Sequence, residues 1–294
     1  MIMQLIYGDI LYCIVLALSV SFIIYYGIGG LLMDITILEK SFKLNKRDKK
    51  KVINYFSKFG KVNYFERLDE KVGDGIYADV IVYADGGWGG VRACNYLLMK
   101  TPRYVMGFSD ATYFLNDILY NHNVPVFYGL NAIDFVDFMS KEVNKKYPDV
   151  FEYCDKILKS RDKKLRNIVG GNLTVFNFFL MNKILEGNKK GLISWLTGKK
   201  LFLEDGGFNV IKGDGSFLLD VELERMRQVL GCELYEVFSG VLFGGVQDDD
   251  YSKNDYLSFK EVFRKHFKNM RIKKVRCSHS GNYVNDLIPL GYSF

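Results

Sequence analysis

Residues 103–120, RYVMGFSDATYFLNDILY, join a short apolar run to a helical pattern through one serine. The first apolar residues are strand formers, and those after the corner recur at helical spacing. Ser109 lies in this corner, flanked by the small residues Gly107 and Ala111. A corner of this kind lifts a serine hydroxyl above a sheet edge, near a helix N-terminus that favours negative charge. The stretch predicts a nucleophilic serine, although a serine before a helix is also an ordinary N-cap.

Strands, helices and glycine-rich turns alternate on both sides of this stretch. An amphipathic helix is expected from Lys49 to Phe59, ended by Gly60. The expected strands of this half cover residues 34–38, 61–65, 78–83, 104–106 and 124–128. This order predicts an α/β domain with a largely parallel sheet.

The second half of the 294-residue chain repeats the alternation after a polar, lysine-rich segment. The expected helices cover residues 167–184, 218–229 and 258–267, and the expected strands cover 200–203, 234–243 and 272–277. The predicted organisation is a membrane anchor over 1–33, an α/β domain with the serine over 34–135, a linker over 136–165 and a smaller α/β domain over 166–294.

The amino terminus carries a long uncharged run. Ile10 to Met33 contains no charged residue and is long enough to cross a bilayer as a helix. The alternative is a buried strand followed by a buried helix, which Gly27, Gly29 and Gly30 favour. The run predicts a transmembrane helix, and therefore membrane attachment through residues 10–33.

Lysine and arginine residues cluster directly after this run, between Lys40 and Lys51. By the positive-inside rule, the body of the protein would lie in the cytoplasm. A basic arm for nucleic acid is the other interpretation of the cluster, but the net charge of +6 does not form an evident nucleic-acid face. No nucleic-acid partner is therefore expected.

The five cysteines are odd in number, scattered and without a C-x-x-C pair. This pattern indicates reduced thiols rather than a disulfide framework or a zinc site. Neither a metal nor a cofactor is expected.

A serine nucleophile needs a base, and the base needs a partner that fixes its tautomer. The chain has three histidines. His122 follows the serine helix too closely to fold back, and His266 lies in a lysine-rich helix. His279 remains, on a polar loop after a strand, while Glu204 ends an apolar strand where an unpaired carboxylate would be costly to bury. The predicted triad is Ser109, His279 and Glu204, although singly they also read as a cap, a surface loop and a solvated strand end.

With their neighbours, these residues resemble the L,D-carboxypeptidase family of serine peptidases, which includes muramoyl-tetrapeptide carboxypeptidases and microcin C self-immunity peptidases. The matching segments follow one another in family order along most of the chain. They are Gly86-Gly-Trp-Gly89, Gly107-Phe-Ser-Asp-Ala-Thr112, Phe127-Tyr-Gly129, Gly170-Gly-Asn-Leu173, Leu201-Phe-Leu-Glu-Asp205, and His279 with Asn285 and Leu287-Ile-Pro-Leu-Gly291. The resemblance implies a flavodoxin-like first domain.

The resemblance also implies roles for single residues. Ser109 would be the nucleophile, His279 the general base and then acid, and Glu204 the residue that orients the imidazole. The backbone N–H groups of Gly87 and Asp110 are the expected oxyanion donors. Substrate contacts are expected from Trp88 and Asn172. Asp85 stands where the family often has arginine, which leaves the exact peptide open.

The sequence thus predicts a metal-independent serine carboxypeptidase that releases a terminal D-amino acid from a short cell-wall peptide resembling a murein tetrapeptide. Two alternatives stay open. One is an amidase that clears a toxic peptide conjugate, and the other is a catalytically degenerate relative that binds peptides at the membrane. The expected partners are the short peptide substrate and a second copy of the chain in a homodimer.

Overall fold

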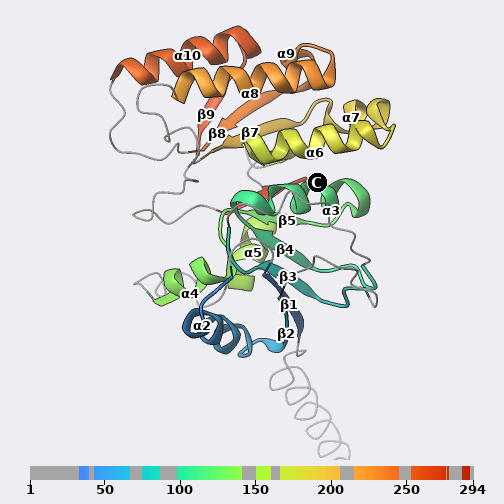
Figure 1. The fold of residues 1–294 in the computed structure, drawn as a ribbon, viewed down its shortest axis with the longest axis vertical. Coiled ribbons are helices and arrows are strands. Elements are labelled where there is room, and N and C mark those ends of the chain that lie inside the picture. Colours follow the sequence, from blue (N-terminus) through green and yellow to red (C-terminus); the bar gives the residue numbers. More distant parts are fainter. Residues whose placement is uncertain are drawn as a thin grey trace, which may run out of the picture.

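The computed structural model describes ten stretches of the chain, which are residues 33–39, 43–66, 75–86, 98–140, 150–159, 166–205, 215–244, 253–275, 277 and 287–291. These residues form two sheets with helices packed around them (Figure 1).

The first sheet has the strand order β10-β5-β4-β3-β1-β2 and is parallel except for β10, which runs antiparallel to β5. Its strands are β1 (Met33–Glu39), β2 (Gly60–Glu66), β3 (Val80–Tyr83), β4 (Tyr104–Gly107), β5 (Val126–Tyr128) and β10 (Ile288–Leu290). Its helices are α2 (Lys46–Phe56), the short 3-10 helix η1 (Ser109–Ala111), α3 (Thr112–His122), α4 (Ala132–Ser140) and α5 (Val150–Lys159).

Alternate side chains of this sheet point to two different cores, because successive residues of a strand face opposite sides. Val80 and Val82 belong to the core beneath α2, α4 and α5. Ile81 and Tyr83 belong to the core on the opposite face, which α3 covers. Both faces are buried, as a parallel sheet requires.

The second sheet is parallel throughout, with the order β6-β7-β8-β9. Its strands are β6 (Ile168–Asn172), β7 (Lys200–Glu204), β8 (Gly240–Phe243) and β9 (Ile272–Lys274). Its helices are α6 (Leu173–Leu185), α7 (Lys189–Leu196), α8 (Gly215–Leu230), α9 (Leu234–Val237) and α10 (Lys253–Phe267). Helix α3 packs on α6 and on β6, so that one continuous core joins both sheets (Figure 1).

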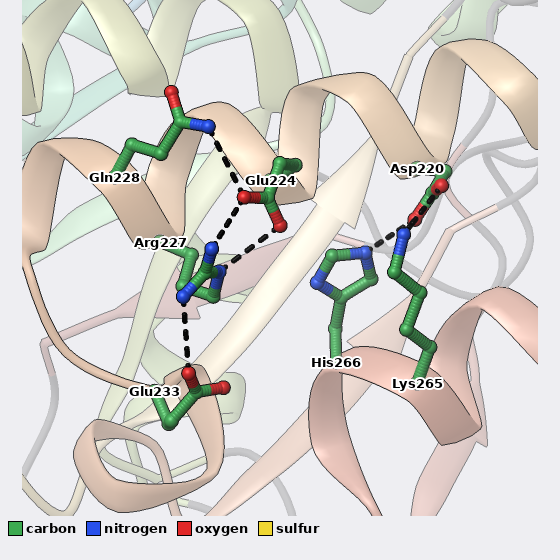
Figure 2. A network of polar contacts seen from close by, with 7 residues as sticks. All are labelled: Asp220, Glu224, Arg227, Gln228, Glu233, Lys265 and His266. Carbon is green, nitrogen blue, oxygen red and sulfur yellow. Dashed lines mark hydrogen bonds and ion pairs between the residues drawn. The ribbon is translucent and has the colours of Figure 1, made fainter.

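Helices α8 and α10 are joined by a polar cluster as well as by apolar packing. The Asp220 carboxylate of α8 accepts hydrogen bonds from Lys265 and pairs with His266 of α10 (Figure 2). The His266 side chain is buried, whereas Lys265 is exposed.

The expected α/β class with largely parallel sheets agrees with the structure, but the transmembrane helix over Ile10 to Met33 needs correction. Among the residues that the structure describes, none belongs to a helix with the length and apolar character needed for a membrane span. Met33 itself opens strand β1, paired with Gly60, while residues 1–32 lie outside the described part. An uncharged apolar run is also what a strand buried on both faces requires, so the run alone did not identify a membrane helix.

The helix expected from Lys49 to Phe59 begins earlier, at Lys46, because the Asn45 side chain caps it by accepting from the Asp48 N–H. Gly60 does not end this helix but opens β2. A Cβ there would lie 1.9 Å from the Met33 carbonyl oxygen, so only glycine lets β2 approach β1 this closely.

Three other segments differ from expectation. Residues 234–243 form helix α9 followed by β8, not one strand. The glycines at the start of the expected helix 167–184 lie in strand β6. Residues 136–165, expected as a linker, include α5, whose apolar side packs on the first sheet. Strand β10 also belongs to the first sheet, although it follows all four strands of the second sheet along the chain.

Candidate active site

Ser109 lies two residues after the carboxyl end of β4, at the start of η1, and has the left-handed φ of 59°. A non-glycine residue in this region costs about 1–2 kcal/mol and persists only where its surroundings impose it. Gly107 makes the corner sterically feasible, because a Cβ there would lie 2.5 Å from the Ala111 Cβ. The alanine in place of a second glycine is therefore compatible with the corner, provided that the first position stays glycine.

Two hydroxyl groups hold the backbone of Ser109. Its N–H donates to the Tyr128 hydroxyl at 2.9 Å, and its carbonyl accepts from the Thr112 hydroxyl at 2.5 Å. The Thr112 hydroxyl also accepts the N–H of Asn172 at 2.9 Å. The Tyr128 side chain of β5, the Thr112 side chain of α3 and the backbone of β6 thus meet around Ser109.

Glu204 is the last residue of β7, and its side chain is fully buried. The Tyr128 hydroxyl donates to its Oε1 atom. Burial, and then the nearby Glu204 charge, raise the pKa of Tyr128 well above its ordinary range. Tyr128 therefore remains protonated at neutral pH and donates to the carboxylate while it accepts from Ser109.

Asn172 lies opposite Glu204 in the register of β6 and β7. Its side-chain oxygen accepts the Val175 N–H at 3.1 Å and so caps helix α6. The adjacent Gly171 has φ +139°, and a Cβ there would lie 2.6 Å from the Thr112 hydroxyl. The paired glycines before Asn172 therefore let β6 pass close to the serine corner.

Gly86, which follows β3, also lies close to Ser109. A Cβ on Gly86 would lie 3.1 Å from the Ser109 Cβ and 3.4 Å from the Asn131 Nδ2 atom. Asn131 in turn accepts the N–H of Phe108 at 2.9 Å. The structure describes one of the two oxyanion donors expected from the sequence. Asp110 is buried beside Ser109, whereas Gly87 lies outside the described residues, as does Trp88.

Asp85 precedes Gly86, and its side chain accepts the Gly86 N–H at 2.7 Å. Burial raises the pKa of the Asp85 carboxyl, which the Gly86 hydrogen bond partly offsets, and the Asp110 charge raises it further. An acidic group therefore lies next to the serine corner.

His279 lies outside the described residues, so its distance from Ser109 is not given by the structure. The described residue before it, Cys277, is buried next to the carboxylate strand. A Cβ on Gly244 would lie 2.6 Å from the Cys277 carbonyl oxygen and 2.8 Å from the Glu204 Cβ. The chain thus passes beside Glu204 two residues before the histidine.

Sequence reasoning missed the two hydroxyl groups that connect the site. Tyr128 and Thr112 were both part of matching segments, but neither was given a role in the site. The signal was weak, namely that a buried tyrosine at a strand end needs a partner for its hydroxyl. Among the described residues, no group of histidine, cysteine and acidic side chains has the arrangement of a metal site.

No protein-family model matches the chain, and no curated protein sequence matches it. Among the solved structures that match the chain are two that align along most of its length. The muramoyltetrapeptide carboxypeptidase from Oxalobacter formigenes is 14% identical with a TM-score of 0.55, and the alignment covers 88% of this chain and 92% of that one. An MccF-like protein from Bacillus anthracis str. Ames is 15% identical with a TM-score of 0.61, at the same coverage of 88% and 92%. The resemblance found in the sequence is therefore confirmed for the fold, and this chain folds as the muramoyltetrapeptide carboxypeptidase and the MccF-like protein do.

Proposed function

We propose that the chain is a serine hydrolase of the peptidase type that acts through an acyl-enzyme, with Ser109 as nucleophile, His279 as base and Glu204 as its carboxylate partner. One observation carries the proposal. A serine in a strained backbone conformation at a strand–helix corner is connected, through one tyrosine hydroxyl, to a buried carboxylate of the other sheet. Strain of this kind is concentrated at functional sites.

In the proposed reaction, His279 removes the proton from the Ser109 hydroxyl as its oxygen attacks a carbonyl carbon. The negative charge develops on the carbonyl oxygen, where the N–H groups of Asp110 and Gly87 are the proposed donors. Collapse breaks the carbon–nitrogen bond, and the leaving amine takes the proton from His279. In the second half, His279 removes a proton from water as the water oxygen attacks the acyl carbon. Collapse then breaks the bond to the Ser109 oxygen, which takes the proton from His279, and the acid product leaves.

The proposed substrate is a short peptide ending in a D-amino acid, resembling a murein tetrapeptide. The named relative in fold, a muramoyltetrapeptide carboxypeptidase, supports this choice. A second candidate, an amidase for a peptide conjugate, is favoured by Asp85. A carboxyl group beside the serine corner would repel a free terminal carboxylate and tolerate a neutral or cationic group instead.

Labelling with a fluorophosphonate, which phosphonylates activated serines with loss of fluoride, tests the chemistry. The wild type should be labelled at Ser109, and Ser109→Ala and His279→Ala should not. Ser239→Ala is the matched control, because Ser239 is exposed and its hydroxyl donates to the Gly198 carbonyl oxygen rather than to a residue of the serine corner. Well-folded wild type that resists labelling would refute the hydrolase and leave the peptide-binding alternative.

A substrate panel then separates the two candidates. Peptides that end in D-alanine and acylated amino-acid conjugates are incubated with the wild type and with Asp85→Asn, and mass spectrometry follows the products. Release of D-alanine supports the carboxypeptidase. Cleavage of the conjugates alone supports the amidase, and Asp85→Asn should then improve the turnover of substrates with a free carboxylate.

A further inference from the structure

The Tyr128 hydroxyl is bonded on two sides by groups that are distant along the chain. Ser109, whose N–H it accepts, lies 19 residues away, and Glu204, to which it donates, lies 76 residues away. One oxygen atom therefore connects the backbone of the serine corner in the first half of the molecule with the carboxylate of the second sheet.

We propose that Tyr128 is a positioning residue of this site, whose hydroxyl holds Ser109 in its strained backbone conformation and fixes the orientation of the Glu204 carboxylate. The inference rests on the proposed function for its catalytic consequence. Its structural part, the restraint on the Ser109 backbone, stands on the hydrogen bonds alone.

The tyrosine ring is fixed so that its hydroxyl can act in this way. The ring is fully buried, and the rings of Phe108 and Phe202 pack against it with centroid distances of 5.3 and 5.4 Å. Gly171 leaves room at its edge, because a Cβ there would lie 2.8 Å from the Tyr128 Cε2 atom. A side chain enclosed this tightly has few alternative rotamers, so its hydroxyl stays at one place.

The direction of the two hydrogen bonds is also fixed. A tyrosine hydroxyl has one proton, and this proton is directed to the Oε1 atom of Glu204, because the backbone nitrogen of Ser109 can only donate. The hydroxyl oxygen is then available to accept from Ser109. The Ser109 N–H is thereby engaged, which agrees with assigning the oxyanion to the N–H groups of Asp110 and Gly87.

Tyr104 provides a matched control within the same sheet. It is buried like Tyr128, and its hydroxyl donates to the carboxylate of Asp155. However, Tyr104 belongs to the core on the opposite face, beneath α2, α4 and α5. Replacing either tyrosine by phenylalanine removes one hydroxyl and keeps the ring, so the two variants differ chiefly in their distance from the site.

The test compares Tyr128→Phe with Tyr104→Phe at a temperature where circular dichroism finds both folded. Two measurements are made, the second-order rate of fluorophosphonate labelling at Ser109 and the amide hydrogen exchange of a peptide covering residues 107–115. Tyr128→Phe should lower the labelling rate roughly ten- to a hundredfold and speed the exchange of the Ser109 amide, because small misplacements of reacting groups are costly. Tyr104→Phe should leave both near the wild type.

A Tyr128→Phe variant whose labelling rate and Ser109 exchange equal those of Tyr104→Phe overturns the inference. The exchange measurement does not need activity. If the wild type is not labelled, the proposed function fails, while the exchange result still decides whether Tyr128 restrains Ser109.

A second variant covers the case in which Tyr128→Phe does not fold. 3-Fluorotyrosine introduced at position 128 nearly keeps the shape of the side chain but makes its hydroxyl more acidic. If the hydroxyl positions the site, the labelling rate should change severalfold and its pH profile should shift. An unchanged rate and an unchanged profile would show that the ring only fills space.

Discussion

Asn116 of helix α3 hydrogen-bonds both backbone polar groups of Gly170 on strand β6. Its Nδ2 atom donates to the Gly170 carbonyl at 2.8 Å, and its Oδ1 atom accepts the Gly170 N–H at 3.2 Å. Because β6 is an edge strand of the second sheet, this side chain takes the place of a neighbouring strand. Thr112 and Gly291 satisfy further backbone groups of the same edge, on Asn172 and Ile168. The two sheets are thus joined by polar contacts at the strand that leads to the site.

Removing the Asn116 side chain should lower the stability of the protein substantially. Asn116 is fully buried, so Asn116→Ala leaves the N–H and carbonyl of Gly170 without their partner in a dry environment. We expect a loss of about 3 kcal/mol in the free energy of unfolding, measured by urea denaturation. Asn121→Ala, at an exposed position on the same helix, is the control; it removes a single side-chain hydrogen bond, to the Asp117 carboxylate, and should cost about 1 kcal/mol. Equal costs for the two variants would contradict the role of Asn116.

The serine corner depends on the pair Gly107 and Ala111. Gly107→Ala should destabilise the protein by about 1–3 kcal/mol, because its Cβ would lie 2.5 Å from that of Ala111 and 3.3 Å from that of Tyr83. The double variant Gly107→Ala/Ala111→Gly removes the closer of these contacts and should recover part of the loss. A double-mutant cycle from thermal unfolding measures the coupling between the two sites. Strictly additive losses would mean that this contact does not decide the effect.

The alternation of short strands and helices was readable from the sequence because it reflects local patterns and burial on both sheet faces. Val80 to Tyr83 shows this well, since three aliphatic side chains are followed by a tyrosine and all four are buried. The prediction of a membrane helix was wrong, and so was the prediction that Gly60 ends a helix, because this glycine opens β2. At Gly60 the deciding fact is its approach to Met33, 27 residues earlier, and no local pattern carries such a contact.

In the candidate site, too, some residues could be predicted from the local sequence and others could not. Ser109 follows from a local strand–corner–helix pattern, and the structure describes it at that corner. The parts played by Tyr128 and Thr112 arise from contacts with residues on other elements, which composition and spacing do not encode. The triad itself stays a prediction, because His279 lies outside the described residues.

The cluster between α8 and α10 should make stability depend on pH (Figure 2). Burial alone would raise the pKa of Asp220, but hydrogen bonds from Lys265 and His266 outweigh it and hold this pKa below its usual range. A carboxyl whose pKa is lower in the folded state stabilises the protein above its unfolded pKa, and this stabilisation is lost as the pH falls. Asp220→Asn should therefore cost about 1–2 kcal/mol at neutral pH, with the difference from wild type shrinking below a pH of about 4.

Glu224 on the same helix gives the control for this prediction. Hydrogen bonds from Arg227 and Gln228 lower the pKa of Glu224 to about 2. The pair lies at the surface, where solvent weakens it, and Glu224→Gln should change stability by less than about 0.5 kcal/mol at neutral pH. Urea denaturation between neutral and acidic pH measures both variants. If the stability difference between Asp220→Asn and the wild type does not depend on pH, then the ionised Asp220 carboxylate is not the source of this stabilisation.

A buried ion pair also connects α3 with α6. Lys183 of α6 lies 2.8 Å from the Asp117 carboxylate of α3, and both side chains are at most 10% exposed. Burial alone would lower the pKa of the Lys183 ammonium group. The hydrogen bonds that this group donates to Asp117 and Glu186 outweigh burial, so the pKa of Lys183 is raised. Lys183→Met should cost about 3 kcal/mol, because it leaves the charge of Asp117 in the interface without its cation. The same change at Lys190, which is exposed on α7, should cost less than about 0.5 kcal/mol.

The double variant Lys183→Met/Asp117→Asn separates the loss of the pair from the burial of a lone charge. Without a charge on either side, the interface should recover much of the stability that Lys183→Met loses, because the large penalty comes from the uncompensated carboxylate. Equilibrium denaturation in urea at neutral pH measures all four members of the cycle. If the double variant is as unstable as the sum of its two single changes, then the packing of the Lys183 stem, not its charge, holds α6 against α3.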